Sequence, residues 1–162
     1  MKWETIFFDC DGVILDSVDI KTKAFEKIFK PYGKENAKKG VEFHLIHGGI
    51  SRFDKFRYFF KNILQLEVSN QTILELGEQF SNFVLEEVLK SSFIDGALET
   101  IQELKKKNVP AYVISGTPND EIQYIFNKRN LSQFFQEIHG APRKKNEIIS
   151  DILARNNYSN KN

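Results

Sequence analysis

A short apolar run ends in two carboxylates at residues 5–12, which read Thr-Ile-Phe-Phe-Asp-Cys-Asp-Gly. The β-branched and aromatic residues predict a buried strand that feeds a turn. Ligands in open α/β sheets bind beyond the carboxyl ends of the strands, where Asp9 and Asp11 would lie. Side chains two residues apart in an extended chain point the same way, so these carboxylates are expected to converge and to suit a divalent cation. A turn of solvated acids after an edge strand would give the same pattern.

Residues 17–91 carry apolar side chains at helical spacing. Helices are predicted at 17–30, 51–66 and 70–89, and short helices and loops over 34–50. This mostly helical block follows directly on the first strand.

Beyond residue 91, helices alternate with strands. The predicted elements there are helices at 95–107, 118–128 and 143–156 and strands at 112–114 and 137–139. Alternation implies a parallel sheet with crossover helices, so the helical block is an insertion after the first strand. We therefore expect an α/β fold, with a doubly wound parallel sheet built from residues 1–16 and 92–162 and a helical domain over 17–91.

Composition and charge exclude several classes of protein. The chain is 41% hydrophobic and 28% charged, as in ordinary globular domains, and its net charge of +1 gives no field that would attract nucleic acid. No segment approaches the ~20 apolar residues of a membrane span, and the N-terminal apolar run is too short for a signal peptide. The single cysteine, Cys10, fits a reducing compartment, so a cytoplasmic protein is expected.

The segment from Phe7 to Ser17 resembles the first signature motif of the haloacid dehalogenase (HAD) superfamily, in the branch of β-phosphoglucomutase and phosphoglycolate phosphatase. It reads Asp9-x-Asp11-Gly-Val-x-x-Asp16-Ser after a hydrophobic strand. The resemblance implies that Asp9 attacks phosphorus and that Asp11 protonates the leaving oxygen and then activates water. Magnesium would be held by the Asp9 carboxylate and the Asp11 backbone carbonyl. Dehalogenase members lack the second aspartate, so Asp11 favours phosphoryl transfer.

A second match follows the strand at 112–114 and reads Ser115-Gly116-Thr117-Pro118. Thr117 is predicted to cap the next helix and Pro118 to open it, and a well-capped helix would by itself explain the segment. Ser115 would also lie at a strand end with backbone N–H groups opening toward it, which is an anion site. The resemblance implies that Ser115 and the Gly116 amide hold phosphoryl oxygens.

A third match is the run Gly-Ala-Pro-Arg-Lys-Lys at residues 140–145, which resembles the family pattern G-[SA]-P-x-x-K. The spacing selects Lys145 as the lysine that would neutralise the phosphoryl group and Asp9, with Lys144 as the alternative. A solvated basic helix end would give the same residues.

The helical insertion corresponds to the family's mobile cap, which closes over the site and supplies specificity. Residues 48–52, Gly-Gly-Ile-Ser-Arg, resemble a segment of the β-phosphoglucomutase cap. Ser51 is predicted to be a helix N-cap with Asp54 as its capping partner. Arg52 and Lys55 would oppose the helix dipole, so removing Arg52 is expected to cost the fold little. A bound phosphate or carboxylate would resolve that conflict, which predicts that Ser51, Arg52 and Lys55 bind substrate; ordinary exposed cations are the alternative.

The family's fourth motif, an acidic turn that completes the metal site, has no counterpart in this sequence. The sequence therefore predicts a HAD-like sheet that is incomplete at its C-terminal strands, and a chain with little activity by itself. In the family's sheet the missing strand lies beside the first one, so the resemblance implies that the first strand becomes a sheet edge, which favours self-association.

We predict a Mg²⁺-dependent HAD phosphatase that hydrolyses a small phosphomonoester, such as a sugar phosphate, through an aspartyl phosphate. The alternatives are a sugar phosphomutase and a non-catalytic remnant that only binds ligand. Lys21 stands where mutases of this branch carry a histidine, which favours a phosphatase. His47 is either part of the cap site or an ordinary loop histidine. The expected partner is a small phosphorylated metabolite, and neither nucleic acid nor membrane.

Overall fold

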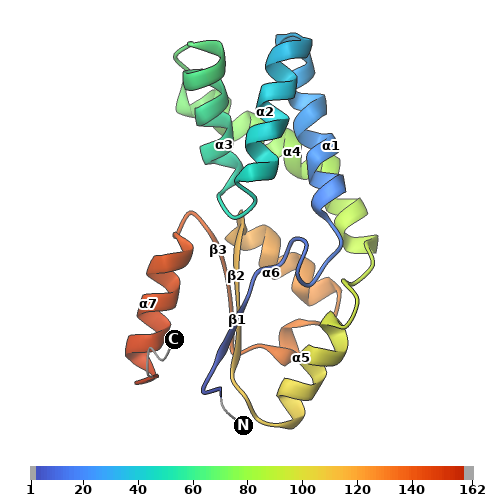
Figure 1. Cartoon of the computed structure of the whole chain (residues 1–162), viewed down its shortest axis with the longest axis vertical. Helices are drawn as coiled ribbons and strands as arrows, with labels where there is room; N and C mark the ends of the chain where they lie inside the picture. The colour runs from blue at the N-terminus through green and yellow to red at the C-terminus, as the bar shows by residue number, and fades with distance from the viewer. Residues whose placement is uncertain (1–2, 159–162) are drawn as a thin grey trace. The chain divides into compact units, whose positions relative to one another are not determined.

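The structure, a computed structural model, describes residues 3–158 and divides into two compact units. Unit 1 comprises the described residues up to Asp16 and from Ser91 onward, and unit 2 is Ser17–Lys90. Unit 1 contains the sheet, whereas unit 2 consists of helices and their connections (Figure 1). No helix in the described part of the chain is long and apolar enough to cross a membrane.

Unit 1 is built on a three-stranded parallel sheet. Its elements in chain order are β1 (Ile6–Phe8), α5 (Ala97–Lys106), β2 (Ala111–Pro118), α6 (Asn119–Lys128), a 3₁₀ turn (Ser132–Phe134), β3 (Glu137–Ala141) and α7 (Lys145–Arg155). The strand order is β1-β2-β3, and both pairings are parallel. β2 is therefore the middle strand, and β1 and β3 are the edges of the sheet in the described residues. The predicted α/β fold with a parallel sheet is confirmed.

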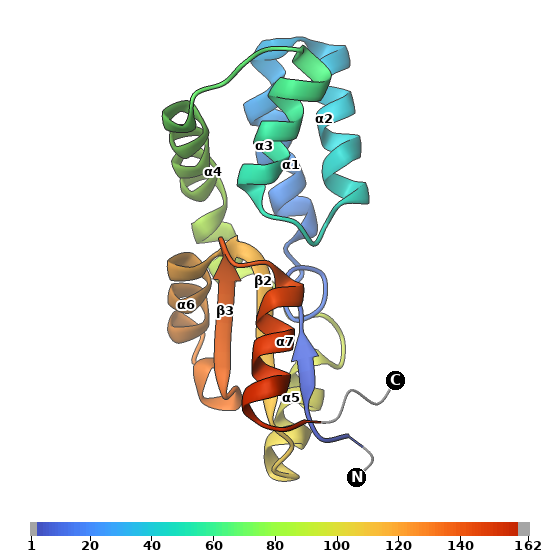
Figure 2. The same ribbon diagram turned by 90° about the vertical axis from the view of Figure 1, so that its left-hand side faces the viewer.

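Helices cover both faces of this sheet, with α7 on one side and α5 and α6 on the other (Figures 1 and 2). Successive side chains of a strand face opposite sides, so a middle strand between two helical layers must be apolar throughout. Residues 111–115 of β2 are all buried. On the α7 side, Tyr112 and Ile114 pack against Ile148 and Ile152. This packing fixes where the first residue of α7 lies.

Unit 2 contains four α-helices. They are α1 (Val18–Phe29), α2 (Lys34–Ile46), α3 (Arg52–Tyr58) and α4 (Asn70–Lys90), with a 3₁₀ turn at Lys30–Tyr32 and a π-helical turn at Phe59–Leu64. The expectation of short helices and loops over 34–50 was wrong, because α2 is one 13-residue helix. Its buried residues are Ala37, Gly40 and His44, which are small or polar and leave no apolar stripe in the sequence.

The core of unit 2 is aromatic. Its large buried side chains include Phe25, Phe29, Phe56, Phe59 and Phe80, each at most 2% exposed. The rings contact one another, with centroids 4.6 Å apart for Phe25 and Phe80 and 3.9 Å apart for Phe29 and Phe59. At the spacing of Phe25 and Phe80, an aromatic pair stabilises a core beyond the area that it buries.

Candidate active site

Asp9 and Lys145 meet where β1 ends and α7 begins. The Lys145 ammonium lies 2.5 Å from Oδ2 of Asp9, and Oδ1 accepts a hydrogen bond of 2.7 Å from the Cys10 N–H. The Lys145 side chain keeps 26% of its surface exposed and the Asp9 side chain 31%, so solvent and solutes can reach the pair. Lys144 instead occupies the N-cap position of α7 and is exposed. The geometry therefore separates the two candidate lysines and brings Lys145 to Asp9.

The loop after β1 is held by its own backbone. The Cys10 carbonyl accepts hydrogen bonds of 2.9 and 3.0 Å from the N–H groups of Ile14 and Leu15, and the Gly12 N–H donates to the Leu15 carbonyl. Gly12 has a φ of +72°, in the left-handed region that glycine adopts without strain. Cys10 is 1% exposed and packs inward, whereas Asp9 and Asp11 on either side of it remain partly exposed.

Asp11 contacts Thr117, a residue that the sequence analysis expected to cap a helix. The Thr117 hydroxyl lies 3.5 Å from Oδ2 of Asp11, which joins the ends of β1 and β2. Thr117 was expected to cap α6, and that prediction was wrong: the strand continues to Pro118, which is the N-cap residue and makes no side-chain cap bond. The sequence could have indicated this placement. Side chains two residues apart in a strand point to the same side, so Thr117 would point as Ser115 does if the strand extends that far.

Ser115 lies within β2, directly after Ile114, where the register with β3 begins to shift, and it is 1% exposed. Its Oγ accepts a hydrogen bond of 3.1 Å from the Thr117 N–H, so the segment curls around its own hydroxyl. Gly116, between them, is half-buried. The predicted phosphate-binding residues thus lie in one irregular part of β2, residues 115–117, which we name the Ser115–Thr117 turn and which contacts Asp11.

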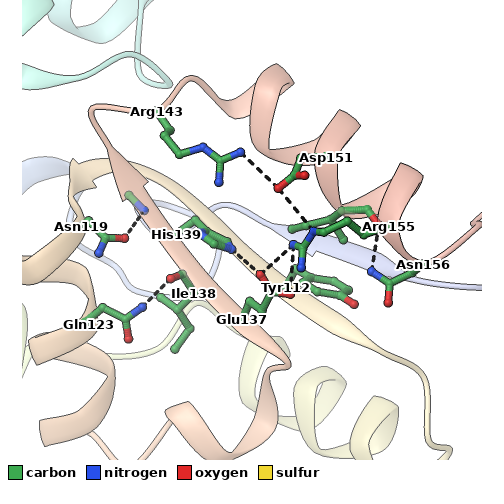
Figure 3. Close-up of polar contacts among 12 residues, drawn as sticks. Tyr112, Asn119, Gln123, Glu137, Ile138, His139, Arg143, Asp151, Arg155 and Asn156 are labelled. Atoms are coloured by element: carbon green, nitrogen blue, oxygen red, sulfur yellow. Dashed lines mark hydrogen bonds and ion pairs between the residues drawn. The ribbon is translucent and has the colours of Figure 1, made fainter.

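Two side chains from α6 form hydrogen bonds with the backbone of β3, whose register with β2 shifts near its end. Asn119 accepts a hydrogen bond of 3.1 Å from the Gly140 N–H, and Gln123 donates one of 2.5 Å to the Ile138 carbonyl (Figure 3). A Cβ at Gly140 would stand 2.3 Å from the Thr117 carbonyl oxygen, so only glycine allows this close approach. The turn at Ser115–Thr117 is therefore packed directly on β3.

Charged side chains of α7, β3 and the loop between them form ion pairs. Arg155 lies 3.0 Å from Glu137 and 3.4 Å from Asp151, Arg143 lies 3.3 Å from Asp151, and His139 lies 2.7 Å from Glu137 (Figure 3). The hydrogen bond from Arg155, helped by His139, holds the pKa of Glu137 below its ordinary value. Among these contacts, the ion pair between Arg155 and Glu137 joins α7, which begins at Lys145, to β3.

In unit 2, Ser51 caps α3 as predicted. Its Oγ accepts from the Asp54 N–H at 3.2 Å and donates to Oδ2 of Asp54 at 2.7 Å. The Ser51 hydroxyl is thus already engaged by its own helix, while its side chain stays partly exposed.

Arg52 is buried rather than displayed on the helix surface. It is 4% exposed, its Nη1 donates to Oγ of Ser81 at 2.7 Å, and its guanidinium lies 4.5 Å from the centre of the Phe80 ring. A buried arginine contributes packing as well as charge. This burial revises the expectation that removing Arg52 would cost the fold little.

Lys55 is also 4% exposed, and its ammonium lies 2.9 Å from Nδ1 of His44. Sequence reasoning missed His44 and singled out His47. His47 is exposed, its Nδ1 lies 3.0 Å from the Phe43 carbonyl, and its ring stacks on that of Phe43. No local pattern links His44 to Lys55, because the contact depends on how two helices pack.

Comparison with known proteins assigns the family. A model of the haloacid dehalogenase-like hydrolases matches residues 6–162. The chain belongs to this family. The predicted superfamily is thereby confirmed. A curated relative of this HAD hydrolase, the 6-phosphogluconate phosphatase of Escherichia coli (strain K12), is 26% identical over 141 residues. The match takes in 83% of this chain and 57% of the relative, so the chain spans little more than half the relative's length.

Solved structures share the fold at low identity. A predicted phosphoglycolate phosphatase from Haemophilus somnus 129pt has a TM-score of 0.71 and 17% identity, over 97% of this chain and 73% of that one. CbbY from Rhodobacter sphaeroides, solved with xylulose-(1,5)bisphosphate, has a TM-score of 0.70 and 14% identity, over 95% and 72% of the two chains. At these identities the likeness establishes the HAD-like fold alone.

The oxygen atoms after β1 of this HAD hydrolase suit a hard divalent cation. Mg²⁺ commonly takes one or two carboxylates from a protein and completes its shell with water and substrate phosphate oxygens. Asp9 and Asp11 are both partly exposed and have one residue between them, so the Asp9 carboxylate and the Asp11 backbone carbonyl are the candidate ligands. Within residues 3–158, no group of three or more His, Cys, Asp and Glu side chains gathers as a metal site. The donors present therefore fit a cation that takes few ligands from this part of the chain.

Proposed function

We propose that this chain carries the nucleophile and phosphate-binding residues of a Mg²⁺-dependent phosphatase that hydrolyses a small phosphomonoester through an aspartyl phosphate. The observation that supports it most strongly is the 2.5 Å contact between Lys145 and Asp9. Like charges about 4 Å apart repel by about 4 kcal/mol at an effective dielectric constant of about 20. A phosphate dianion approaching the Asp9 carboxylate meets this repulsion, and an ammonium beside that carboxylate offsets it.

In the proposed reaction, an oxygen of Asp9 forms a bond to phosphorus as the bond from phosphorus to the alcohol oxygen breaks. The protonated Asp11 carboxyl gives its proton to the leaving alcohol. The resulting Asp11 carboxylate then takes a proton from water, which attacks phosphorus and releases inorganic phosphate and the free Asp9 carboxylate. Each step leaves the catalytic groups ready for the next, as general acid and base catalysis requires.

The Ser115–Thr117 turn is proposed to hold the transferring phosphoryl group, with the Ser115 hydroxyl and the Gly116 N–H as donors. Donors fixed before the reaction stabilise charge that develops during phosphoryl transfer. The Asp9 carboxylate and the Asp11 carbonyl would hold Mg²⁺, which supplies charge neutralisation at the phosphoryl oxygens. The packing of this turn against Gly140 supports such a fixed arrangement.

Unit 2 is proposed to act as the cap and to select the substrate through Ser51, Arg52 and Lys55. Two cations on one helix suit a substrate with an anionic group. The curated relative is named for its action on 6-phosphogluconate, a phosphorylated sugar acid, which makes this compound the first substrate to test.

The test measures Mg²⁺-dependent phosphate release by the whole protein. Asp9→Asn is expected to reduce turnover to background and to abolish a hydroxylamine-sensitive phosphoenzyme, with the melting temperature preserved. Asp120→Asn, a carboxylate exposed on α6, is the matched control and should leave turnover unchanged. Near-normal turnover in Asp9→Asn would refute the proposed chemistry. Transfer of the phosphoryl group within a sugar bisphosphate, without net phosphate release, would identify a mutase instead.

A further inference from the structure

The register of β2 and β3 changes beside the Ser115–Thr117 turn. Ile114 pairs with His139 and Pro118 pairs with Ala141, so three residues of β2 lie opposite a single residue of β3. An excess of residues on one strand defines a β-bulge, and it disrupts the ladder of backbone hydrogen bonds locally. The part of β2 that is proposed to hold phosphate is therefore a part that the ladder does not restrain.

Gly140 is the single residue opposite the turn, and the Asn119 side chain supplies the partner of its N–H. Oδ1 of Asn119 accepts a hydrogen bond of 3.1 Å from the Gly140 N–H (Figure 3). Gly140 is buried, and a buried N–H needs a partner because burial removes the water that would otherwise accept from it. Asn119 is the first residue of α6, so the acceptor comes from the segment that directly follows the strand.

This hydrogen bond joins the two segments that carry the proposed phosphate contacts. The Ser115 hydroxyl and the Gly116 N–H lie just before Asn119 along the chain. Lys145, the first residue of α7, lies shortly after Gly140. Asn119 therefore connects the Ser115 and Gly116 donors to the strand end that leads to Lys145.

The spacing of these donors matters for the proposed reaction. A phosphoryl group in transfer would contact donors from both segments, so their separation must be fixed before the substrate arrives. A Cβ at Gly140 would collide with the backbone of Thr117 and Asn119, which shows that the segments already pack closely. Packing limits how closely the segments approach, and the hydrogen bond limits how far they separate.

Gln123 offers a comparison within the same helix. Its Nε2 donates a hydrogen bond of 2.5 Å to the Ile138 carbonyl (Figure 3). Ile138 lies in the regular part of the ladder, where it pairs with Val113. Each contact joins α6 to β3 through one hydrogen bond, and of the two it is the contact of Asn119 that lies opposite the turn.

We propose that Asn119 is a positioning residue whose side-chain oxygen takes the place of a strand partner and fixes the Ser115–Thr117 turn relative to Lys145. The inference rests on the phosphate-binding roles proposed above for these residues. It adds to them a residue that takes no part in proton transfer, with its Oδ1 oriented toward Gly140.

Hydrogen exchange of the whole protein tests the contact without any substrate. The Gly140 N–H is expected to exchange at least about fivefold faster in Asn119→Leu than in the wild type, because one hydrogen bond is lost. Asn119→Asp keeps an acceptor oxygen and should keep the exchange rate within about threefold. Gln123→Leu is the control, in which the Gly140 N–H should exchange as in the wild type. Equal exchange in Asn119→Leu and the wild type would overturn the proposal.

Turnover of 6-phosphogluconate by the whole protein tests the positioning role. Asn119→Leu is expected to lower kcat about tenfold or more, because a misplacement of about 1 Å can cost on the order of 10²-fold in rate. Gln123→Leu also loses one hydrogen bond between α6 and β3, and should melt at a similar temperature but keep kcat within about threefold. A purely structural role would lower kcat equally in both variants or in neither, and either result would overturn the proposal.

Asn119→Asp separates positioning from direct contact with the substrate. Its carboxylate keeps the acceptor, so kcat should stay within about threefold of the wild type, while its charge repels phosphate and should raise KM. A kcat as low as that of Asn119→Leu would show that the amide itself serves the reaction, and would overturn the positioning role. A wild-type protein that releases no phosphate would refute the proposed function and the role of Asn119 in turnover, whereas the exchange test would still decide the contact with Gly140.

Discussion

Replacing Gly140 by alanine tests how the phosphate-binding turn is held. The added Cβ would stand 2.3 Å from the Thr117 carbonyl oxygen and 2.8 Å from both N and Cα of Asn119. All three atoms belong to the backbone, so no side-chain rotation can relieve the contacts. Overpacking typically costs about 1–3 kcal/mol, and a clash with the backbone of a neighbouring segment belongs at the upper end.

The expected change in melting temperature follows from the size of the unit. A loss of 1 kcal/mol lowers the melting temperature of a domain of 60–100 residues by roughly 4–8 °C, so Gly140→Ala should melt more than about 10 °C below the wild type. The turn must also shift, which moves Thr117 away from Asp11 and the Asn119 side chain away from β3. Phosphate release by the whole protein should therefore fall together with stability.

Differential scanning calorimetry of the chain measures the effect, with Gly48→Ala as the matched control. A Cβ at Gly48 meets no atom within 4 Å, so this variant should melt within about 2 °C of the wild type. A Gly140→Ala variant that melts as the control does would refute the reasoning. It would show that β3 and the turn separate at little cost, and that the turn is not preorganised by this contact.

Three further predictions follow from the side-chain contacts. Lys145→Met should lower turnover on the order of 10²–10³-fold, as is typical when a contact to the transition state is lost. In the same phosphate-release assay, the control Lys144→Met should change turnover less than about threefold. Arg52→Ala should raise KM for 6-phosphogluconate and also lower the melting temperature, because the guanidinium is buried; a normal melting temperature would contradict the packing role. The hydrogen bond from Arg155 lowers the pKa of Glu137 in the folded state, so the Glu137 carboxylate stabilises the fold fully above its ordinary pKa of 4.5. This stabilisation is lost as the pH falls through the lower folded-state pKa. Glu137→Gln should therefore make the melting temperature fall less steeply as the pH is lowered.

The sequence predicted the residues at the ends of the strands because local rules decide them. A hydrophobic run ending in Asp9 fixes a carboxylate beyond a strand, and the spacing after Gly140 brings Lys145 rather than Lys144 to the start of the next helix. Both positions depend on the chain within a few residues. The parallel sheet then brings them together, as strand–helix alternation requires.

The contacts that the sequence did not predict arise between elements. Helix α2 carries Ala37, Gly40 and His44 on its buried side, so hydrophobic periodicity could not find it. Arg52 and Lys55 were read from charge and helix position, and their burial depends on aromatic rings from α1 and α4. Packing of this kind overrides the preference of charged residues for the surface, and only the tertiary structure reveals it.

The two lysines proposed to act on the substrate differ in the chemistry of their partners. Lys145 contacts the Asp9 carboxylate, which is the group that the proposed reaction phosphorylates. Its ammonium would then interact with the phosphoryl oxygens once that carboxylate has formed its bond to phosphorus. Lys55 contacts the His44 imidazole in unit 2, and its proposed role is to bind an anionic group that undergoes no reaction. A lysine that serves the transition state should affect kcat, and one that serves binding alone should affect KM. Measuring both constants for Lys145→Met and Lys55→Met therefore tests whether the partner of a buried or half-buried lysine predicts which of the two roles it plays.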